Sequence, residues 1–155
     1  MVFHRLDFSK ASPGGYAAMA ALQAHVEGAG LEHKLLELVK MRASQMNGCA
    51  FCIDMHSKDA RASGETEQRL YLLNAWREAP IYTARERAAL AWTEAVTQLG
   101  KEGVPDAMYD QMRVQFSDKE LVDLTLAIIA INGWNRLAIS FRSEPGHYQP
   151  GDYKK

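Results

Sequence analysis

The stretch Asn47-Gly48-Cys49-Ala50-Phe51-Cys52-Ile53-Asp54-Met55-His56 contains the only two cysteines of the 155-residue chain, and a histidine follows the second cysteine by four residues. The Asn-Gly pair at its start is typical of a turn between two elements. If the chain is helical from Ala50, the two thiols and the imidazole follow i, i+3, i+7 spacing and share one helical face. The stretch therefore predicts two helices joined by a turn, with two sulfurs and an imidazole directed at one volume.

The spacing of the two cysteines indicates a redox or metal-binding role rather than a stabilising disulfide. A disulfide between Cys49 and Cys52 closes a loop of two residues, and it would contribute little because disulfide stabilisation grows with loop length. In a reducing cytoplasm, a Cys-x-x-Cys pair is redox-active or metal-binding more often than structural.

The overall composition narrows the function classes. The chain is 47% apolar and 24% charged with a net charge of −1, so no basic excess points to nucleic acid. The longest unbroken apolar runs, such as 126–131, are far shorter than the roughly 20 residues that span a bilayer. No apolar segment of secretory type follows the basic residues of 1–10. We therefore expect a cytoplasmic protein that binds neither nucleic acid nor membranes.

Helical periodicity predicts an all-α fold of six to seven helices in a single domain. Around the helical core, 12–142, we expect an N-terminal arm over 1–11 and an irregular tail over 143–155. No convincing period-2 strand pattern occurs. The expected helices cover about 13–28, 31–46, 50–62, from 66 to before Pro80, from 84 to before Gly100, 106–115 and 118–142.

The last of these helices also predicts assembly. Its leucines and isoleucines are spread around most of its circumference, and a helix that is apolar on nearly all sides is buried on nearly all sides. The pattern favours a helix that is partly central and partly at a subunit interface, and hence an oligomer. Within it, the polar segment 132–136 is interpreted as making helix–helix hydrogen bonds, because buried polar groups require partners. Lining a substrate pocket is the alternative.

The two thiols of the motif have different activating surroundings. Cys49 lies at a helix N-terminus, where unpaired N–H groups and the helix dipole favour the reactive thiolate. Cys52 lies one turn before His56, whose imidazole can take its proton. One thiol can therefore attack an oxidised substrate while the other resolves the product as a disulfide.

Glu37 is the candidate fourth member of this site. It lies in Leu35-Leu36-Glu37-Leu38-Val39, and burying its carboxylate without a partner would be costly. A chain that turns back at 47–48 can bring it to His56, whose tautomer it would fix. Glu37, His56 and Cys52 would then form a proton relay. On periodicity alone, however, Glu37 equally fits a solvent-facing stripe shared with Lys34 and Lys40.

These residues carry a family resemblance. Glu37 followed by Cys49-x-x-Cys52-x-x-x-His56 resembles the signature of the AhpD-like alkylhydroperoxidases of the carboxymuconolactone decarboxylase superfamily, specifically its small peroxidase-related members. The resemblance covers about 34–142 and includes the segments 41–44 and 88–94.

The resemblance implies an antioxidant enzyme with an all-α fold that assembles as a homo-trimer or homo-hexamer. It implies thiol-dependent reduction of hydroperoxides without haem, flavin or metal. In this role Cys52 is the peroxide-attacking nucleophile, Cys49 the resolving thiol, and His56 and Glu37 the relay. A sulfenic acid on Cys52 becomes a Cys49–Cys52 disulfide, which an external dithiol, lipoyl-type or other, reduces by exchange.

Two alternatives stay open at this point. The peroxidatic prototype has a histidine between its cysteines, where this chain has Ala50 and Phe51, so a thiol–disulfide oxidoreductase with little peroxidase activity fits the same residues. A zinc-binding or structural module is the alternative from another class, because Cys-x-x-Cys-x-x-x-His offers three ligands. The fourth ligand would have to be a carboxylate or one of the other histidines, His4, His25, His33 and His147.

Overall fold

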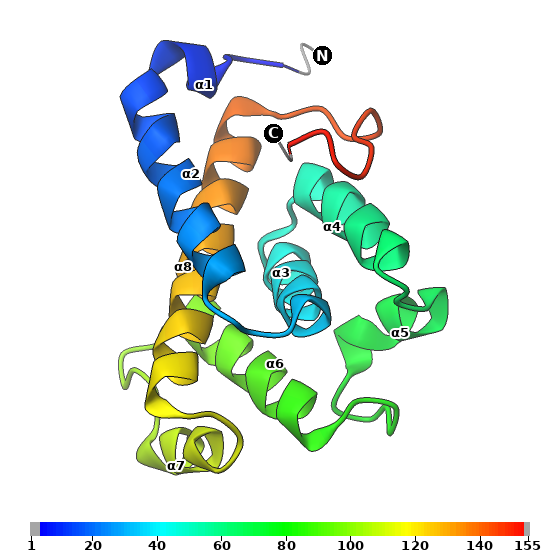
Figure 1. Cartoon of the computed structure of the whole chain (residues 1–155), viewed down its shortest axis with the longest axis vertical. Coiled ribbons are helices and arrows are strands. Elements are labelled where there is room, and N and C mark those ends of the chain that lie inside the picture. Colours follow the sequence, from blue (N-terminus) through cyan, green and yellow to red (C-terminus); the bar gives the residue numbers. More distant parts are fainter. Residues whose placement is uncertain (1–3, 154–155) are drawn as a thin grey trace.

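The computed structural model describes residues 4–153. Residues 1–3 and 154–155, the ends of the predicted arm and tail, lie outside the described range. Within that range the chain forms eight α-helices and one 3-10 turn (Figure 1). They are α1 (Phe8–Ala11), α2 (Pro13–Gly28), α3 (His33–Asn47), α4 (Ala50–Ala62), α5 (Glu67–Leu72), η1 (Leu73–Ala75), α6 (Ala84–Thr97), α7 (Asp106–Gln115) and α8 (Asp118–Phe141). The predicted all-α fold is confirmed, with slightly more helices than the six to seven expected.

The helix ends follow the local signals of the sequence. Thr83 and Ser117 each form a complete capping box, with Glu86 and Glu120 bonding back to the cap N–H groups. Pro13 occupies the first position of α2, as expected. The two capping boxes satisfy N–H groups that helices leave unpaired at their start, and proline at the first position has no N–H to satisfy, so local sequence places these three helix starts.

One short helix was not predicted, and two predicted helix ends are wrong. Within the arm, Phe8–Ala11 form α1, whose cap residue Asp7 accepts hydrogen bonds from the Ser9 and Lys10 N–H groups, and α2 then begins at Pro13 as expected. The helix expected from 66 to before Pro80 ends at Leu72, with η1 continuing to Ala75, and α6 stops at Thr97 rather than just before Gly100. Leu99 therefore lies outside the helix with 64% of its surface exposed. The apolar stripe of α6 ends at Val96, which packs on the core.

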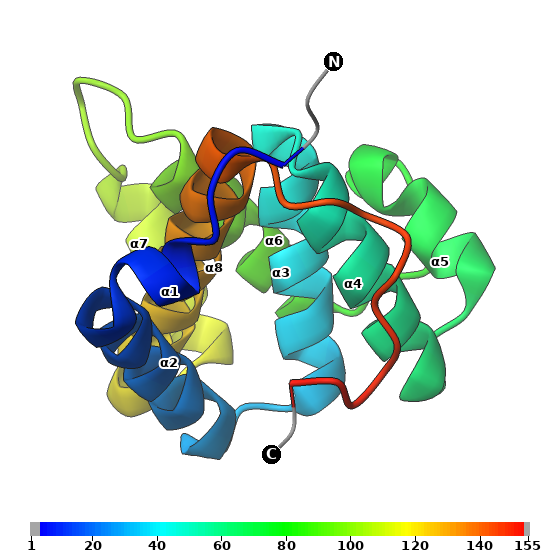
Figure 2. The same cartoon turned by 90° about the horizontal axis from the view of Figure 1, so that it is seen from above.

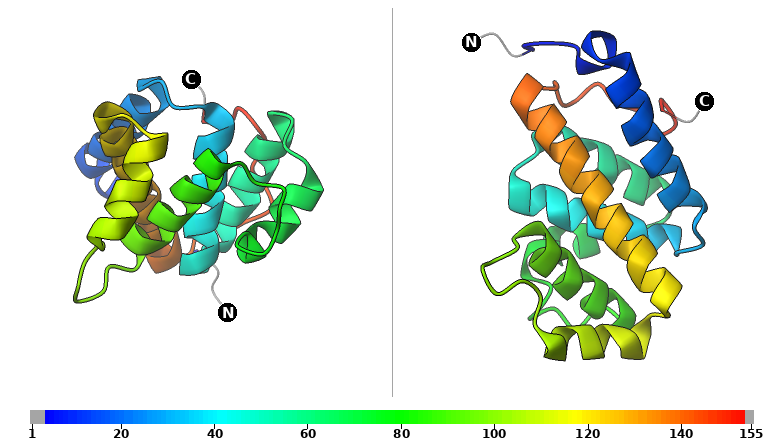
Figure 3. Two further views of the ribbon diagram at one scale, coloured as in Figure 1. Left: turned by 90° about the horizontal axis from the view of Figure 1, so that it is seen from below. Right: turned by 90° about the vertical axis from the view of Figure 1, so that its left-hand side faces the viewer.

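The long helix α8 organises the core. It packs against α2, α3 and α6, and Figures 1 and 3 show α2 lying alongside it. A Cβ at Gly133 would lie 2.7 Å from the Met19 methyl carbon of α2, the far end of a flexible side chain that would have to shift. By length and composition α8 could span a bilayer, and 39% of its apolar window is buried inside the protein. Its outward residues Val122, Ile129 and Ile139 stay exposed in the single chain.

A polar network joins α8 to the end of α3, directly before the cysteine motif. The Asn47 amide donates to the side-chain oxygens of Asn132 and Asn135, both at 2.9 Å, and the Asn135 amide donates to Ser44 Oγ at 3.0 Å. Asn135 and Ser44 are fully buried. The expectation that this polar segment of α8 makes helix–helix hydrogen bonds is confirmed. The network fixes the turn that precedes Cys49 to the central helix.

Replacing Asn135 by alanine tests how much this network contributes to the free energy of unfolding. The change leaves the buried Ser44 hydroxyl and Asn47 amide short of partners, so we expect a loss of about 3 kcal/mol in the free energy of unfolding. Urea denaturation measures it. Val114→Ala is the control, because Val114 is 79% exposed, and it should change stability by less than about 0.5 kcal/mol. A similarly small effect of Asn135→Ala would mean that the network is not needed for stability.

Candidate active site

The turn between α3 and α4 places the candidate residues. Gly48 ends α3 in the left-handed region, with φ of 69°, a conformation that costs glycine little. The Gly48 and Cys49 N–H groups bond back to the carbonyls of Gln45 and Ser44. The chain reverses here, and α4 packs along α3. This packing brings the middle of α3, where Glu37 lies, against α4.

Cys49 and Cys52 are joined in a disulfide at the first turn of α4. Cys49 is the N-cap residue, and its Sγ accepts a hydrogen bond from the Cys52 N–H at 3.3 Å. Each cysteine is only 1% exposed, and Phe51 and Ala138 of α8 pack against them. The Cys-x-x-Cys spacing therefore lets the two sulfurs bond while the helix that carries them stays intact.

Glu37 and His56 form a buried pair between α3 and α4. His56 Nδ1 lies 3.0 Å from Glu37 Oε2, and the two side chains are 8% and 3% exposed. Lys40 donates to the other carboxylate oxygen, Oε1, at 2.9 Å and is 6% exposed. At the outer edge of the group, His33 Nε2 lies 3.8 Å from the same Oε1.

The charges of these neighbours keep Glu37 ionised. Burial raises the pKa of its carboxyl, but the hydrogen bond and charge of His56, together with the Lys40 ammonium, outweigh burial and lower that pKa to about 2 from the ordinary 4.5. A carboxylate held so firmly in its charged form is a fixed orienting partner for the imidazole, since its bond to Nδ1 also selects the histidine tautomer.

The structure places the four predicted residues in two contacting pairs. Glu37 bonds His56, and Cys49 bonds Cys52, all four being buried. In the described part of the chain and with the disulfide formed, no hydrogen bond joins the His56 ring to either sulfur. The step from His56 to Cys52 therefore stays a prediction.

Lys40 is the residue of this group that sequence reasoning missed. The solvent-facing interpretation of Glu37 and Lys40 is wrong, because both are buried; only Lys34 of the proposed stripe is exposed. Their i, i+3 spacing was the available signal, but it predicts a pair on one helix face without saying whether that face is buried.

Asp59 completes the only potential metal-binding group found among residues 4–153. One ligand atom each from Glu37, His56 and Asp59 lies within 4.8 Å of the others. Glu37, however, is already bonded to the Lys40 ammonium, whose charge opposes a divalent cation at the same carboxylate. The geometry thus favours a proton-handling group over a metal centre, and the cysteines, paired in the disulfide, lie outside this group.

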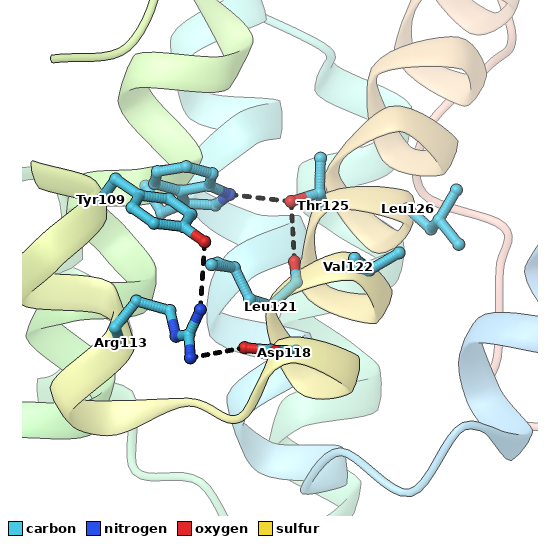
Figure 4. A pocket seen from close by; sticks show the side chains of 8 residues that line it. Tyr109, Arg113, Asp118, Leu121, Val122, Thr125 and Leu126 are labelled. Carbon is cyan, nitrogen blue, oxygen red and sulfur yellow. Dashed lines mark hydrogen bonds and ion pairs between the residues drawn. The ribbon is translucent and has the colours of Figure 1, made fainter. Parts of the chain in front are cut away.

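A surface hollow lies away from this site, between α6, α7 and α8 (Figure 4). It is lined by Trp92, Tyr109, Arg113, Asp118, Leu121, Val122, Thr125 and Leu126. The Trp92 indole donates to Thr125 Oγ1, and Arg113 pairs with Asp118 at its rim. Trp92 itself is 7% exposed and belongs to the hydrophobic core.

Comparisons with known proteins identify a family and a similar relative. A model of the carboxymuconolactone decarboxylase family matches residues 13–95. The uncharacterized protein YdfG of Bacillus subtilis (strain 168) is 43% identical over 136 residues, which are 88% of this chain and 92% of that protein.

Solved structures give the same fold. ATU0492 from Agrobacterium tumefaciens, a protein of unknown function and putative antioxidant defence protein AhpD, is 48% identical with a TM-score of 0.89, covering 94% of this chain and 99% of that one. The debrominase Bmp8 has a TM-score of 0.78 at 18% identity, covering 89% and 74%. At that identity the likeness concerns the fold alone.

Proposed function

The chain belongs to the carboxymuconolactone decarboxylase family, of the AhpD-like type, and on this premise we propose that it is a thiol peroxidase that reduces hydroperoxides through Cys49 and Cys52. The observation that carries the proposal is the disulfide between these two residues at the start of α4, the helix whose buried His56 bonds an ionised Glu37. A pair that closes and opens at a helix N-terminus is the dithiol/disulfide couple that the reaction needs.

The proposed cycle balances in three steps. The Cys52 thiolate attacks one peroxide oxygen, the O–O bond breaks, and the alcohol leaves with a proton, so that Cys52 becomes a sulfenic acid. The Cys49 thiol then attacks the Cys52 sulfur, an S–S bond forms, and water leaves. An external dithiol such as a lipoyl group reduces this disulfide by exchange and is itself oxidised. The sum is one hydroperoxide and one dithiol converted to alcohol, water and a disulfide.

In this cycle His56 takes the Cys52 proton, and Glu37 holds the imidazole. His56 follows Cys52 by one helical turn, and the carboxylate on Nδ1 leaves Nε2 as the nitrogen that accepts a proton. Lys40 is the counter-charge that keeps Glu37 anionic while the imidazole changes its own charge. The proton relay therefore ends at the buried Glu37–Lys40 ion pair and does not continue to solvent.

One observation favours a second candidate, a thiol–disulfide oxidoreductase. Phe51 packs on the disulfide from the position between the cysteines where a peroxidatic prototype carries a histidine. An apolar ring at this place offers no proton to a leaving alkoxide. A disulfide substrate has less need of such a proton, because its leaving group is a thiolate, which is a much weaker base.

Peroxide titration of the reduced protein tests the proposal. One equivalent of cumene hydroperoxide should remove both thiols and yield one equivalent of alcohol, with the disulfide located by mass spectrometry. With dihydrolipoamide as the reductant, the rate of hydroperoxide reduction should then exceed the rate of reduction of a small disulfide substrate. The reverse order would favour the oxidoreductase, and stoichiometric zinc in the purified protein would contradict both. The predicted homo-trimer or homo-hexamer and the cytoplasmic location remain proposals, which light scattering and fractionation test.

A further inference from the structure

The tail after α8 is fastened to the redox helix. Residues 143–153 leave α8 and pass over α4, in orange to red in Figure 2. The Gly146 N–H donates to Asp54 Oδ2 at 2.9 Å. Lys58 Nζ bonds both Asp54 Oδ2 at 2.9 Å and the Tyr148 carbonyl at 3.0 Å. The Asp54 carboxylate of α4 therefore anchors the tail through its bonds to Gly146 and Lys58.

The last anchor of the tail reaches the proton-handling group. Tyr148 is 7% exposed, and its hydroxyl donates to Asp59 Oδ1 at 2.8 Å. Asp59 is half-buried, and its carboxylate lies within 4.8 Å of both Glu37 and His56. A residue near the C-terminus therefore bonds directly to the second carboxylate that faces the imidazole.

We infer that Tyr148 is a positioning residue of the redox site, which holds the Asp59 carboxylate against His56 and so assists the imidazole in taking the Cys52 proton. The inference rests on the function proposed above. A carboxylate near an imidazole favours the protonated ring, and it does so only while it stays in place. Asp59 is only half-buried, and among residues 4–153 no cation pairs with it as Lys40 pairs with Glu37, so the tyrosine hydroxyl is what keeps it turned inward.

The surroundings of Tyr148 suit a permanent donor. Burial and the Asp59 carboxylate raise the pKa of its hydroxyl well above the ordinary value, so the proton stays on Tyr148 throughout the physiological range. Its ring stacks on Tyr153, with centroids 5.5 Å apart. The ionisable groups around this cluster are Glu37, Lys40 and His33 of α3, Asp54 and Lys58 of α4, and His147, Asp152 and Tyr153 of the tail.

The test is the pH profile of Cys52 alkylation by iodoacetamide in the reduced Cys49→Ser background, where Cys52 is the only thiol. Tyr148→Phe keeps the ring and removes the hydroxyl. It should move the midpoint to higher pH by about half a unit, which lowers the rate below the midpoint about threefold. Asp59→Asn should act in the same direction and more strongly, by about tenfold.

The double variant separates positioning from packing. Because Tyr148 acts through Asp59, adding Tyr148→Phe to Asp59→Asn should cause no further shift. Tyr153→Phe is the matched control, since it removes a hydroxyl from the stacked ring of the same tail and should leave the profile unchanged. An unchanged profile in Tyr148→Phe overturns the inference. So does a second shift in the double variant, or a rate raised equally at every pH, which would report only a loosened tail.

This experiment stands apart from the peroxidase assay. Alkylation needs no peroxide and no dithiol substrate, so a protein that fails to reduce hydroperoxides can still display the Tyr148 effect. Conversely, an active peroxidase with an unchanged Tyr148→Phe profile leaves the proposed function intact and removes Tyr148 from it.

Discussion

Cys52→Ser should abolish hydroperoxide reduction, lowering kcat/KM by at least about a thousandfold, because a serine hydroxyl is not ionised at neutral pH and cannot replace a thiolate as nucleophile. The fold should tolerate the change, since oxygen is the smaller atom and the buried site can accept it. Steady-state peroxide consumption with dihydrolipoamide measures the loss, and circular dichroism confirms that the variant is folded.

Cys49→Ser is the matched control, and it should behave differently. With its attacking thiol intact, this variant should still react once with peroxide and then stop at the sulfenic acid, which dimedone traps on Cys52. Cys52→Ser should form no dimedone adduct. If instead Cys52→Ser consumed one equivalent of peroxide and Cys49→Ser none, the two cysteines would have exchanged roles, with the N-cap thiol as the nucleophile.

Glu37→Gln should both slow thiolate formation and destabilise the fold. The amide keeps the shape of the side chain but removes the charge that orients His56 and neutralises the buried Lys40. A pKa lowered from 4.5 to about 2 corresponds to about 3 kcal/mol of stabilisation by ionisation of Glu37. Because the folded pKa is the lower one, this contribution is complete above pH 4.5 and is lost as the pH falls towards 2.

Urea denaturation at two pH values checks both parts of this prediction. At pH 7 the variant should be less stable than the wild type by about 3 kcal/mol, and near pH 2.5 the difference should largely disappear. Alkylation of Cys52 at pH 7 should slow as well. Glu102→Gln, a change of the same kind at an exposed position outside the helices, serves as the control. Equal alkylation rates in the wild type and Glu37→Gln would exclude Glu37 from the relay.

Helix ends could be predicted from the sequence where they depend on interactions between neighbouring residues. The capping boxes at Thr83 and Ser117 and the left-handed Gly48 each depend on a few neighbouring residues, and each begins or ends a helix close to a predicted boundary. The i, i+3 spacing of the cysteines likewise predicts their proximity. The same reasoning failed for Leu99, because a periodic stripe does not say where its helix stops.

The surroundings of Glu37 required the tertiary structure. Its spacing from Lys40 fits a buried ion pair and a solvated one equally well, and only the packing of α4 on α3 decides between them. The hydrogen bond from Tyr148 to Asp59 is even harder to predict from the sequence. These residues are 89 positions apart, and the tail that carries Tyr148 has no periodic pattern from which a contact could be predicted.

The burial of the disulfide has a consequence for how the cycle is timed. With each cysteine 1% exposed, a bulky thiol can meet the sulfurs only during moments when the first turn of α4 separates from Phe51 and α8. Regeneration by such a thiol then proceeds at its chemical rate multiplied by the fraction of molecules that are open. Narrow, flexible dithiols need less opening than globular ones. Burial therefore slows reduction of the disulfide by bulky cellular thiols. Each further contact that holds this turn closed would lower the rate of unwanted reduction and, equally, the rate at which the enzyme is regenerated.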